Sequence, residues 1–353
     1  STPFPPAEAG QAVSPKGESL PRFGGGRDEG QNKQKKSYLS FEINRTKIMK
    51  RILKTLFWLL VPFSLSGQLT PVTNQYILNP LTINPSYAGN RGALNIAAFY
   101  RKQWAGISGA PETMTLAIDA PVLDAKLGLG LIISNDKIGV TKETRFITNY
   151  SYKISMKNGS LSLGLGAGII TTNTAWSDLV VIDPEDQSSL VDSRVFVVPD
   201  FSFGAYYTYN NYFAGFSIPQ LIGYKFDFVN NKYVLKVNLG QYYYLFNTGY
   251  VFNLTSKTKF FPSALVTFSP GEKLLYDINA HFNFFDRLWL GASYRSNRSA
   301  AGLLQFAINN QLRIAYTYDF DFSKLGKYSN GSHEIMIRYE FKYKVDVVNP
   351  LIF

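Results

Sequence analysis

The chain has 353 residues, with 36 lysines and arginines against 25 acidic residues, two histidines and no cysteine. The lack of cysteine excludes a disulfide framework and a thiolate metal site. Roughly half of the net charge of +11 belongs to residues 1–67, and the other basic residues are scattered, which does not favour nucleic-acid binding.

The first 67 residues contain two segments that do not look like a folded domain. Residues 1–48 are rich in Gly, Pro, Ser and Lys without hydrophobic periodicity, which predicts disorder. Residues 49–67 begin with Met-Lys-Arg, continue with an apolar run over 56–63 and end in small residues, the pattern of a secretory signal peptide. We therefore interpret Met49 as the true start and residues 1–48 as an extension upstream of it.

A lead-in segment, residues 68–91, follows the signal peptide. It contains two Asn-Pro pairs, Asn79-Pro80 and Asn84-Pro85, which favour extended or turn geometry and forbid a regular helix. Its Tyr, Leu and Ile content is unlike that of a plain linker. We expect an ordered segment that lies in the periplasm or folds back into the lumen of the barrel that the following strands predict.

From residue 92 to 344, apolar and polar side chains alternate with a period of two. Over 274–284, for example, the apolar positions are even-numbered, and the odd-numbered ones include Asp277, Asn279 and His281. Almost no segment reads as a helix that could cover such an apolar face, and a closed barrel that turns this face toward lipid removes the difficulty. The predicted strands are 92–102, 113–120, 126–134, 143–156, 160–173, 200–209, 212–219, 233–254, 257–269, 272–285, 287–296, 300–309, 311–321 and 332–344.

Composition and connection lengths support an all-β fold, a transmembrane antiparallel β-barrel of about 14 strands. Aromatic residues make up 15% of the chain, yet no run of 18 apolar residues follows residue 68. Every second connection is predicted to be a short periplasmic turn, at 121–125, 157–159, 210–211, 255–256, 285–286 and 309–310. The long connections, at 173–199, 220–232 and 323–331, all fall at the opposite end. Residues 345–353 remain as a C-terminal tail.

Four motifs between and beside the strands resemble one known family. They are the lead-in sequence 75–89, Arg-Lys-Gln-Trp-Ala-Gly-Ile-Ser-Gly-Ala-Pro at 101–111, Asn-Asp-Lys-Ile-Gly at 135–139 and Gly-Ser-His-Glu-Ile at 331–335. In this order they are similar to the PorP/SprF family, outer-membrane components associated with the type IX secretion system of Bacteroidetes. The chain lacks the arginine that the family carries near its end.

The resemblance implies a non-enzymatic role, without cofactor or metal, in export or surface attachment of large cell-surface proteins such as gliding adhesins. It implies an outer-membrane location, and its partners would be those surface proteins, other secretion components and outer-membrane lipid. Trp104 is read as part of a rigid contact patch, as a membrane-interface anchor or as a residue packed inside the barrel. The candidate partner-contact or family-motif residues are Tyr76, Asn79, Pro80, Asn84, Pro85, Gln103, Trp104, Gly106, Gly109, Pro111, Asn135, Asp136, Gly139, His333 and Glu334.

Two alternatives stay open in the sequence. A barrel of about fourteen strands is wide enough for a general diffusion pore, and its inward charges of both signs indicate no ion preference. An outer-membrane lipid hydrolase would need a serine–histidine constellation, for which His281 and His333 are the available histidines. His281 falls on the polar face, and the neighbours of His333 on a strand point to the opposite face, so this alternative is disfavoured.

Overall fold

The structure is a computed structural model, which describes residues 73–123, 125–178, 192–227, 232–236, 239 and 242–341. The predicted upstream extension 1–48, the signal peptide 49–67 and the tail 345–353 lie outside these residues, and the boundaries drawn at 68, 92 and 344 stay predictions. Among the described residues, no helix is long and apolar enough to cross a membrane.

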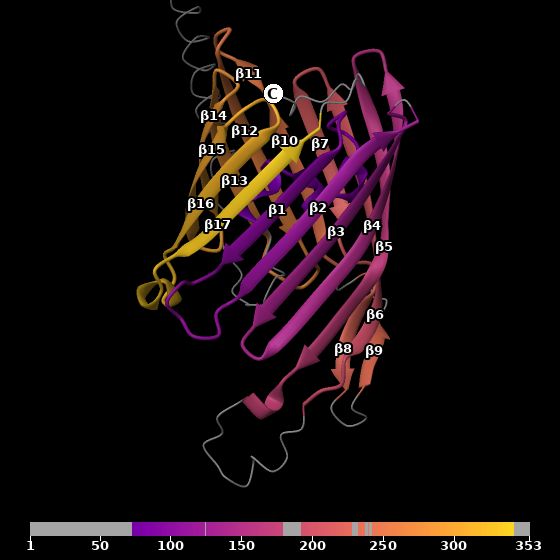
Figure 1. The fold of residues 1–353 in the computed structure, drawn as a ribbon, viewed down its shortest axis with the longest axis vertical. Coiled ribbons are helices and arrows are strands. Elements are labelled where there is room, and N and C mark those ends of the chain that lie inside the picture. Colours follow the sequence, from indigo (N-terminus) through magenta and orange to yellow (C-terminus); the bar gives the residue numbers. More distant parts are fainter. Residues whose placement is uncertain are drawn as a thin grey trace, which may run out of the picture. The chain divides into compact units, whose positions relative to one another are not determined.

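Fourteen antiparallel strands form one closed barrel, because the first strand pairs with the last. Figure 1 shows the strands side by side along the wall. They are β1 (Asn95–Lys102), β2 (Glu112–Val122), β3 (Leu127–Ile138), β4 (Thr141–Met156), β5 (Gly159–Thr174), β6 (Phe196–Tyr209), β7 (Tyr212–Ile218), β10 (Tyr244–Tyr250), β12 (Thr258–Phe268), β13 (Leu275–Phe284), β14 (Leu288–Arg295), β15 (Ser299–Ala307), β16 (Leu312–Asp321) and β17 (Ser332–Glu340).

The fold class is thus confirmed, and each barrel strand lies within or close to a predicted one. The prediction for the eighth strand, 233–254, is wrong in its first half. Its barrel portion is β10, extended past Val251 by the short β11 (Phe252–Asn253). Residues 232–236 instead form β9, which pairs with β8 (Gly223–Asp227) in a separate two-stranded sheet. Strand-forming residues on both sides of Gly240 concealed this break.

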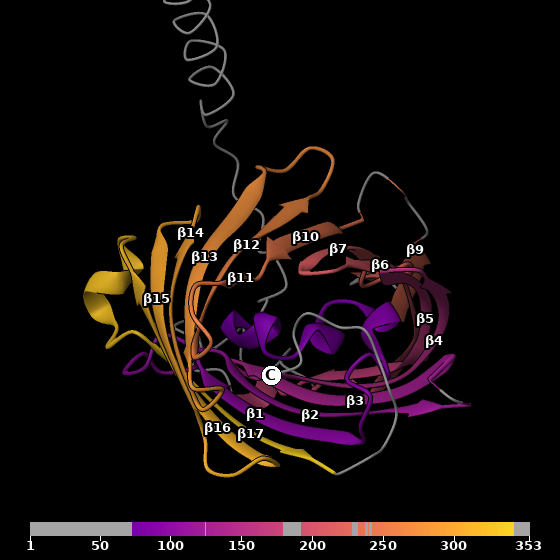
Figure 2. The ribbon, with the colours of Figure 1, turned by 90° about the horizontal axis from the view of Figure 1, so that it is seen from above.

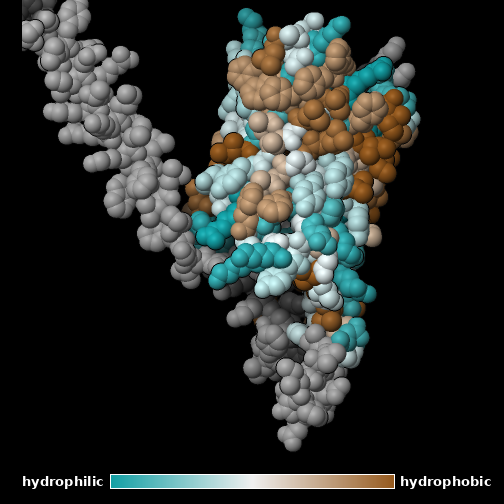
Figure 3. All heavy atoms as spheres, turned by 90° about the vertical axis from the view of Figure 1, so that its left-hand side faces the viewer, coloured by the Kyte–Doolittle hydropathy of each residue, from teal (hydrophilic) through white to brown (hydrophobic). Residues whose placement is uncertain are grey.

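The alternation of side chains separates an outer apolar face from an inner polar face, as predicted. On β13, the outward Ile278 is 56% exposed, whereas the inward Asn279 and His281 are 3% and 1% exposed. Figure 3 shows the outer wall from the left-hand side of Figure 1, with hydrophobic residues gathered over the upper part and hydrophilic ones toward the lower end. A wall with this outer surface is matched to lipid rather than to water.

The connections sort between the two ends of the barrel as the sequence predicted. Short turns join β2 to β3, β4 to β5, β6 to β7, β13 to β14 and β15 to β16, and we name this the turn end. The long connections after β5, β7 and β16 all lie at the other end, which we name the loop end (lower in Figure 1). The 3-10 turns η4 (Trp176–Asp178) and η6 (Leu325–Tyr328) belong to the loop end.

The residues before β1 lie inside the barrel. Residues 73–94, here called the lumenal segment, contain the 3-10 turns η1 (Asn74–Ile77), η2 (Pro80–Thr82) and η3 (Pro85–Tyr87), and Figure 2 shows them enclosed by the ring of strands. Its apolar side chains pack with inward residues of the wall in one buried cluster. The barrel therefore has a packed core inside its lumen in addition to its lipid-facing surface.

The outer face provides a test of the barrel's depth in the membrane. Leu165 lies outward in the middle of β5 and is 60% exposed, whereas Met156 lies outward at the turn end of β4. We expect Leu165→Arg to lower the free energy of unfolding by about 2–4 kcal/mol and Met156→Arg by about 0–1 kcal/mol, because the cost of arginine depends on depth. Urea unfolding of the protein folded in phospholipid vesicles measures both, and equal losses would contradict a lipid-facing wall.

Candidate functional site: the lumenal segment and the loop-end rim

The fifteen residues singled out from the sequence fall in two neighbouring regions. Tyr76, Asn79, Pro80, Asn84 and Pro85 lie in the lumenal segment, buried within the barrel. The others lie at the loop end, in the connections after β1 and β3, in the last residues of β3 and at the start of β17. Glu334 joins the two regions, since it is a residue of the wall that binds the lumenal segment directly.

A buried carboxylate holds the start of the lumenal segment. Glu334, 1% exposed, accepts hydrogen bonds from the Asn74 backbone N–H at 3.1 Å and from the Thr73 hydroxyl. Its own backbone carbonyl accepts from the Gln75 side-chain amide at 3.1 Å. These bonds satisfy backbone and side-chain donors at the first 3-10 turn, where intrahelical partners are lacking.

The charge of Glu334 is balanced by an arginine of the neighbouring strand. Arg101 Nη1 lies 3.0 Å from Glu334 Oε2, and Arg101 Nη2 lies 3.4 Å from Asp319 Oδ2. Asn74 also donates to Asp319, at 3.0 Å. Since β1, β16 and β17 are adjacent, this network ties three strands and the lumenal segment together at the seam where the barrel closes. A buried charge pair of this kind depends strongly on keeping both partners.

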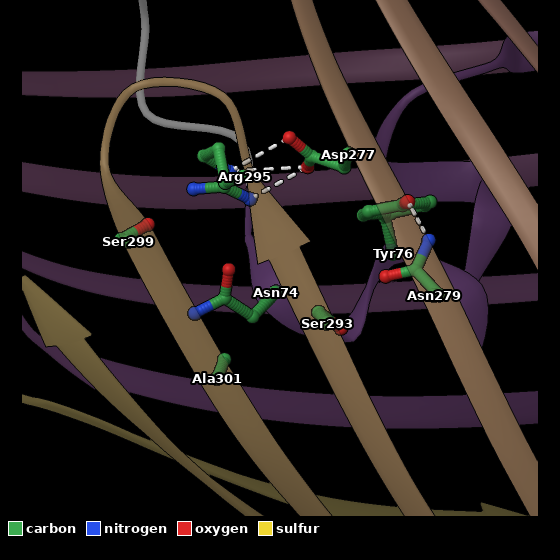
Figure 4. A pocket seen from close by; sticks show the side chains of 8 residues that line it. All are labelled: Asn74, Tyr76, Asp277, Asn279, Ser293, Arg295, Ser299 and Ala301. Atoms are coloured by element: carbon green, nitrogen blue, oxygen red, sulfur yellow. Dashed lines mark hydrogen bonds and ion pairs between the residues drawn. The ribbon is translucent and has the colours of Figure 1, made fainter. Parts of the chain in front are cut away.

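Tyr76 extends from η1 toward β13, where Figure 4 shows a small polar pocket between the segment and the wall. The Tyr76 hydroxyl accepts a hydrogen bond from Asn279 at 2.6 Å. Beside it, Arg295 binds Asp277 with three N–H···O contacts of 2.9–3.1 Å. The cavity volume of the pocket is about 10 Å³, far below that of typical ligand sites, which begins at about 300 Å³. We therefore read it as part of the packing around the segment.

The two Asn-Pro pairs turn the segment against the wall as the sequence predicted, without a regular helix. Asn79 and Asn84 precede η2 and η3, and Pro80 and Pro85 occupy the first positions of those turns. Asn84 caps η3, because its Oδ1 accepts from the Ser86 N–H at 3.0 Å. Its Nδ2 donates to the carbonyls of Ala205 and Phe216, at 3.1 and 3.2 Å, which attaches the turn to β6 and β7.

Glycines on the inner wall make room for this turn. A Cβ atom on Gly164 would lie 2.2 Å from the Ser86 nitrogen, and one on Gly128 would lie 1.9 Å from the Ala88 carbonyl oxygen. A Cβ atom on Gly204 would lie 2.0 Å from Asn84 Oδ1. These glycines reduce the bulk of the inner wall where η3 and the residues beside it pack.

A second set of charges fixes the segment near the turn end. The Leu78 carbonyl accepts from Arg338 Nη1 at 2.8 Å and from Arg91 Nη2. Glu340 Oε1 lies 3.3 Å from Arg91 Nη1 and 3.2 Å from Arg338 Nε. The segment is thus attached at both ends of the lumen by ion pairs and hydrogen bonds that involve its backbone.

The connections after β1, β3 and β16 meet at the loop-end rim. Two backbone bonds join the connections after β1 and β16: Ala105 N–H donates to Gly331 O at 2.8 Å, and Asn330 N–H donates to Ala105 O at 2.7 Å. Gly139 N–H donates to Gly109 O at 2.9 Å and joins the third. Gly106, Gly109, Gly139 and Gly331 have φ values of +94°, +72°, +58° and +80°, a region that favours glycine.

Trp104 is held in this rim by two hydrogen bonds. Its indole Nε1–H donates to Asp321 at 3.0 Å and its backbone N–H donates to the Ser332 hydroxyl at 3.1 Å. The neighbouring Gln103 N–H donates to Pro111 O at 2.9 Å and closes the base of the connection. Trp104 is thus half-buried at the rim, and its three readings stay predictions.

Asn135 and Asp136 lie at the loop end of β3. Asn135 is exposed and donates to the Thr144 hydroxyl at 2.8 Å, and Asp136 accepts from the Thr113 hydroxyl at 2.5 Å. They share the rim with Gly109 and Gly139, but within the described part of the chain they form no hydrogen bond with Trp104 or Glu334. The structure thus brings the motifs together through the backbone of the connections rather than in one side-chain cluster.

The histidines do not form a hydrolytic site. His281 is buried in the lumen between the rings of Phe261 and Trp289, each with its centroid 6.3 Å away. His333 faces outward and its Nδ1 lies 2.7 Å from the Tyr316 hydroxyl. Its neighbours Ser332 and Glu334 are buried toward the lumen, as predicted for residues adjacent on a strand. No group of metal-binding side chains occurs among the described residues.

The charged lumenal residues are the part of the site that the sequence did not identify. Arg101, Asp319, Arg338 and Glu340 hold the segment from the wall, and none was singled out. Their signal was present as charges on the inward face of strands. The pattern could place them inside the barrel, but it could not tell which of them bind the segment.

The Glu334–Arg101 pair generates a prediction. Glu334→Gln removes the charge that balances a buried arginine, so we expect the free energy of unfolding to fall by about 3 kcal/mol. The control is Glu112→Gln, which breaks the exposed Lys102–Glu112 pair of 2.9 Å at the same rim and should leave stability unchanged. Urea unfolding in vesicles compares the two variants, and an unchanged midpoint for Glu334→Gln would rule out this anchoring role.

Comparison with known proteins gives a clear result at the level of family. The profile described as "Type IX secretion system membrane protein PorP/SprF" matches residues 65–339. No curated protein matches the chain.

Solved structures similar to the chain are outer-membrane proteins of low identity. Omp33 of Acinetobacter baumannii is 9% identical over 70% of this chain and 98% of its own, with a TM-score of 0.43. The monoaromatic hydrocarbon channel CymD is 9% identical over 79% and 95%, with a TM-score of 0.45. The toluene transporter TbuX of Ralstonia pickettii is 10% identical over 79% and 96%, with a TM-score of 0.44. We base no functional inference on likenesses at this level.

The family profile spans both regions of the site, from the lumenal segment to the rim residues of β17. The description of the profile as a membrane protein agrees with the apolar outer wall of the barrel. The four motifs that resemble the family lie in the lumen and at the rim. The chain is a multi-pass β-barrel of the outer membrane and belongs to the PorP/SprF family of type IX secretion system membrane proteins.

Proposed function

We propose that this barrel assists the export or surface attachment of large cell-surface proteins, of the gliding-adhesin kind, by the type IX secretion system. The observation that carries the proposal is the lumenal segment, which is covalently part of the chain and packs with the wall in a buried cluster. A lumen occupied in this way supports a platform that holds a protein partner rather than a general diffusion pore.

The loop-end rim is the surface we assign to the partner. Gly106, Ser108, Gly109, Asn135 and Gly139 are exposed there, on connections whose backbones are bonded to one another. A surface that is ordered before binding loses little conformational entropy when a partner docks, which favours affinity. We take this end to face the cell exterior, in keeping with long outer loops and short periplasmic turns.

The role predicts a phenotype that separates secretion from solute uptake. Deletion of the gene should remove specific proteins from the cell surface and leave small-solute uptake unchanged. Quantitative proteomics of shaved cells and uptake assays measure the two effects. An unchanged surface proteome would contradict the proposal, and purified protein that gives steady ohmic channels in planar bilayers would favour the pore.

The assignment of the rim predicts the effect of bulky charge there. Ser108→Arg combined with Asn135→Arg should reduce the surface level of the dependent protein severalfold, because unpaired charges in an interface are costly to desolvate. Asn158→Arg, at an exposed position of the turn end, serves as the control and should have no effect. Barrel levels in the outer membrane should be equal in all strains, and a loss of surface protein with Asn158→Arg alone would move the partner site to the turn end.

A further inference from the structure

The connection between β16 and β17, residues 322–331, extends sideways beyond the barrel wall. It contains η6, and both Figure 1 and Figure 2 show this short helix outside the ring of strands, beside β15 and β16. The rest of the rim lies above the ends of the strands. This connection instead projects outward, over the space that surrounds the barrel. In an outer-membrane barrel that region is lipid.

The side chains of this connection combine apolar rings with positive charge. Phe322, Leu325 and Tyr328 are 56%, 38% and 79% exposed, and Lys324 and Lys327 between them are exposed as well. Residues 322–331 contain no Asp or Glu. Apolar side chains beside lysines, without acidic residues, are typical of segments that lie in a membrane interface.

The apolar side chains continue a surface that already faces lipid. The outward row of β16 is Ile314, Tyr316, Tyr318 and Phe320, each 37–48% exposed. Phe322 extends this row, since its ring packs edge-on against Phe320 with centroids 5.0 Å apart. The connection is therefore continuous with the lipid-facing wall and not with the polar lumen.

The depth of the connection agrees with the position of lipid headgroups. β16 has 10 residues, which at about 3.3 Å per residue and a tilt of about 45° span about 23 Å, close to the height of about 25 Å of the apolar band of such barrels. β4 and β5 have 16 residues each and extend further at the loop end. The segment after β16 thus begins where the apolar band ends.

Hydrogen bonds fix both ends of the connection. Asp321 accepts from the Ser323 N–H at 2.7 Å, and the Phe322 N–H donates to Arg298 O at 2.7 Å. At the far end, the Asn330 N–H donates to Ala105 O at 2.7 Å. Because its ends are held, the segment presents its apolar and basic side chains in one place.

We propose that residues 322–331 form an interfacial anchor that binds anionic lipid. Phe322, Leu325 and Tyr328 insert at the boundary of the acyl chains, and Lys324 and Lys327 bind the phosphate groups of the lipid headgroups. The inference rests on the outer-membrane location and not on the secretion role, so the two fail independently.

The absence of native cysteine permits a direct test. In the full-length protein, Tyr328→Cys is labelled with an environment-sensitive fluorophore. Its fluorescence should be quenched by lipid that carries a spin label near the headgroup and should be protected from iodide in the water. Asn297→Cys, at an exposed position of the polar turn after β14, is the matched control and should show the reverse. Both are measured in phosphatidylcholine vesicles with and without phosphatidylglycerol.

The lysines are tested in the same labelled protein. Phosphatidylglycerol should raise the equilibrium constant for membrane contact of the labelled segment by about fivefold for each lysine. Replacing Lys324 and Lys327 by glutamine should abolish this increase. Iodide quenching at residue 328 as strong as at residue 297 in both vesicles would overturn the anchor. Protection that appears in native outer-membrane fragments and not in lipid vesicles would also overturn it, in favour of a protein partner.

Discussion

The pairing of β1 with β17 is the interaction on which the rest of this structure depends. In lipid, an unpaired strand edge leaves backbone groups without water, so the sheet must close on itself. Closure forces one face of every strand inward, into a volume that must be filled or hydrated. This protein fills much of it with its own residues 73–94, and the network of Glu334, Arg101 and Asp319 lies at the same seam.

The two faces of the wall contact different surroundings, lipid on the outside and the packed lumen on the inside. The outer face needs only apolar side chains of almost any size, because lipid adapts to them. The inner face meets a defined surface, and there single atoms decide what fits, as at Gly164, whose missing Cβ admits Ser86. The inner face also carries buried charges, several of which pair with a nearby strand or bind the segment, as Arg101 does with Glu334 and Arg338 with the Leu78 carbonyl, which makes it the more specific surface of the two.

This difference explains what could be predicted from the sequence. The alternation imposed by lipid is local, so thirteen strands, with small differences at their ends, and the sorting of turns followed from it, whereas the strand around Tyr244 was wrong in its first half. The lumenal contacts are not local, since Asn74 binds Asp319 across 245 residues and Arg338 binds Leu78 across 260. No periodic pattern records such pairs. The motif at 331–335 pointed to Glu334, but its partners became visible only in three dimensions.

The path of the lumenal segment has a consequence for the order in which the barrel assembles. Its contacts with the first half of the chain span short distances in sequence, with Asp119, Ser151, Ala205 and Ser217 lying 30 to 134 residues from their partners. Its contacts with the second half span 203 to 261 residues. Contacts of smaller separation cost less loop-closure entropy and form earlier. We therefore expect the segment to pack first against β2–β7. The later strands then pair around it and close the barrel.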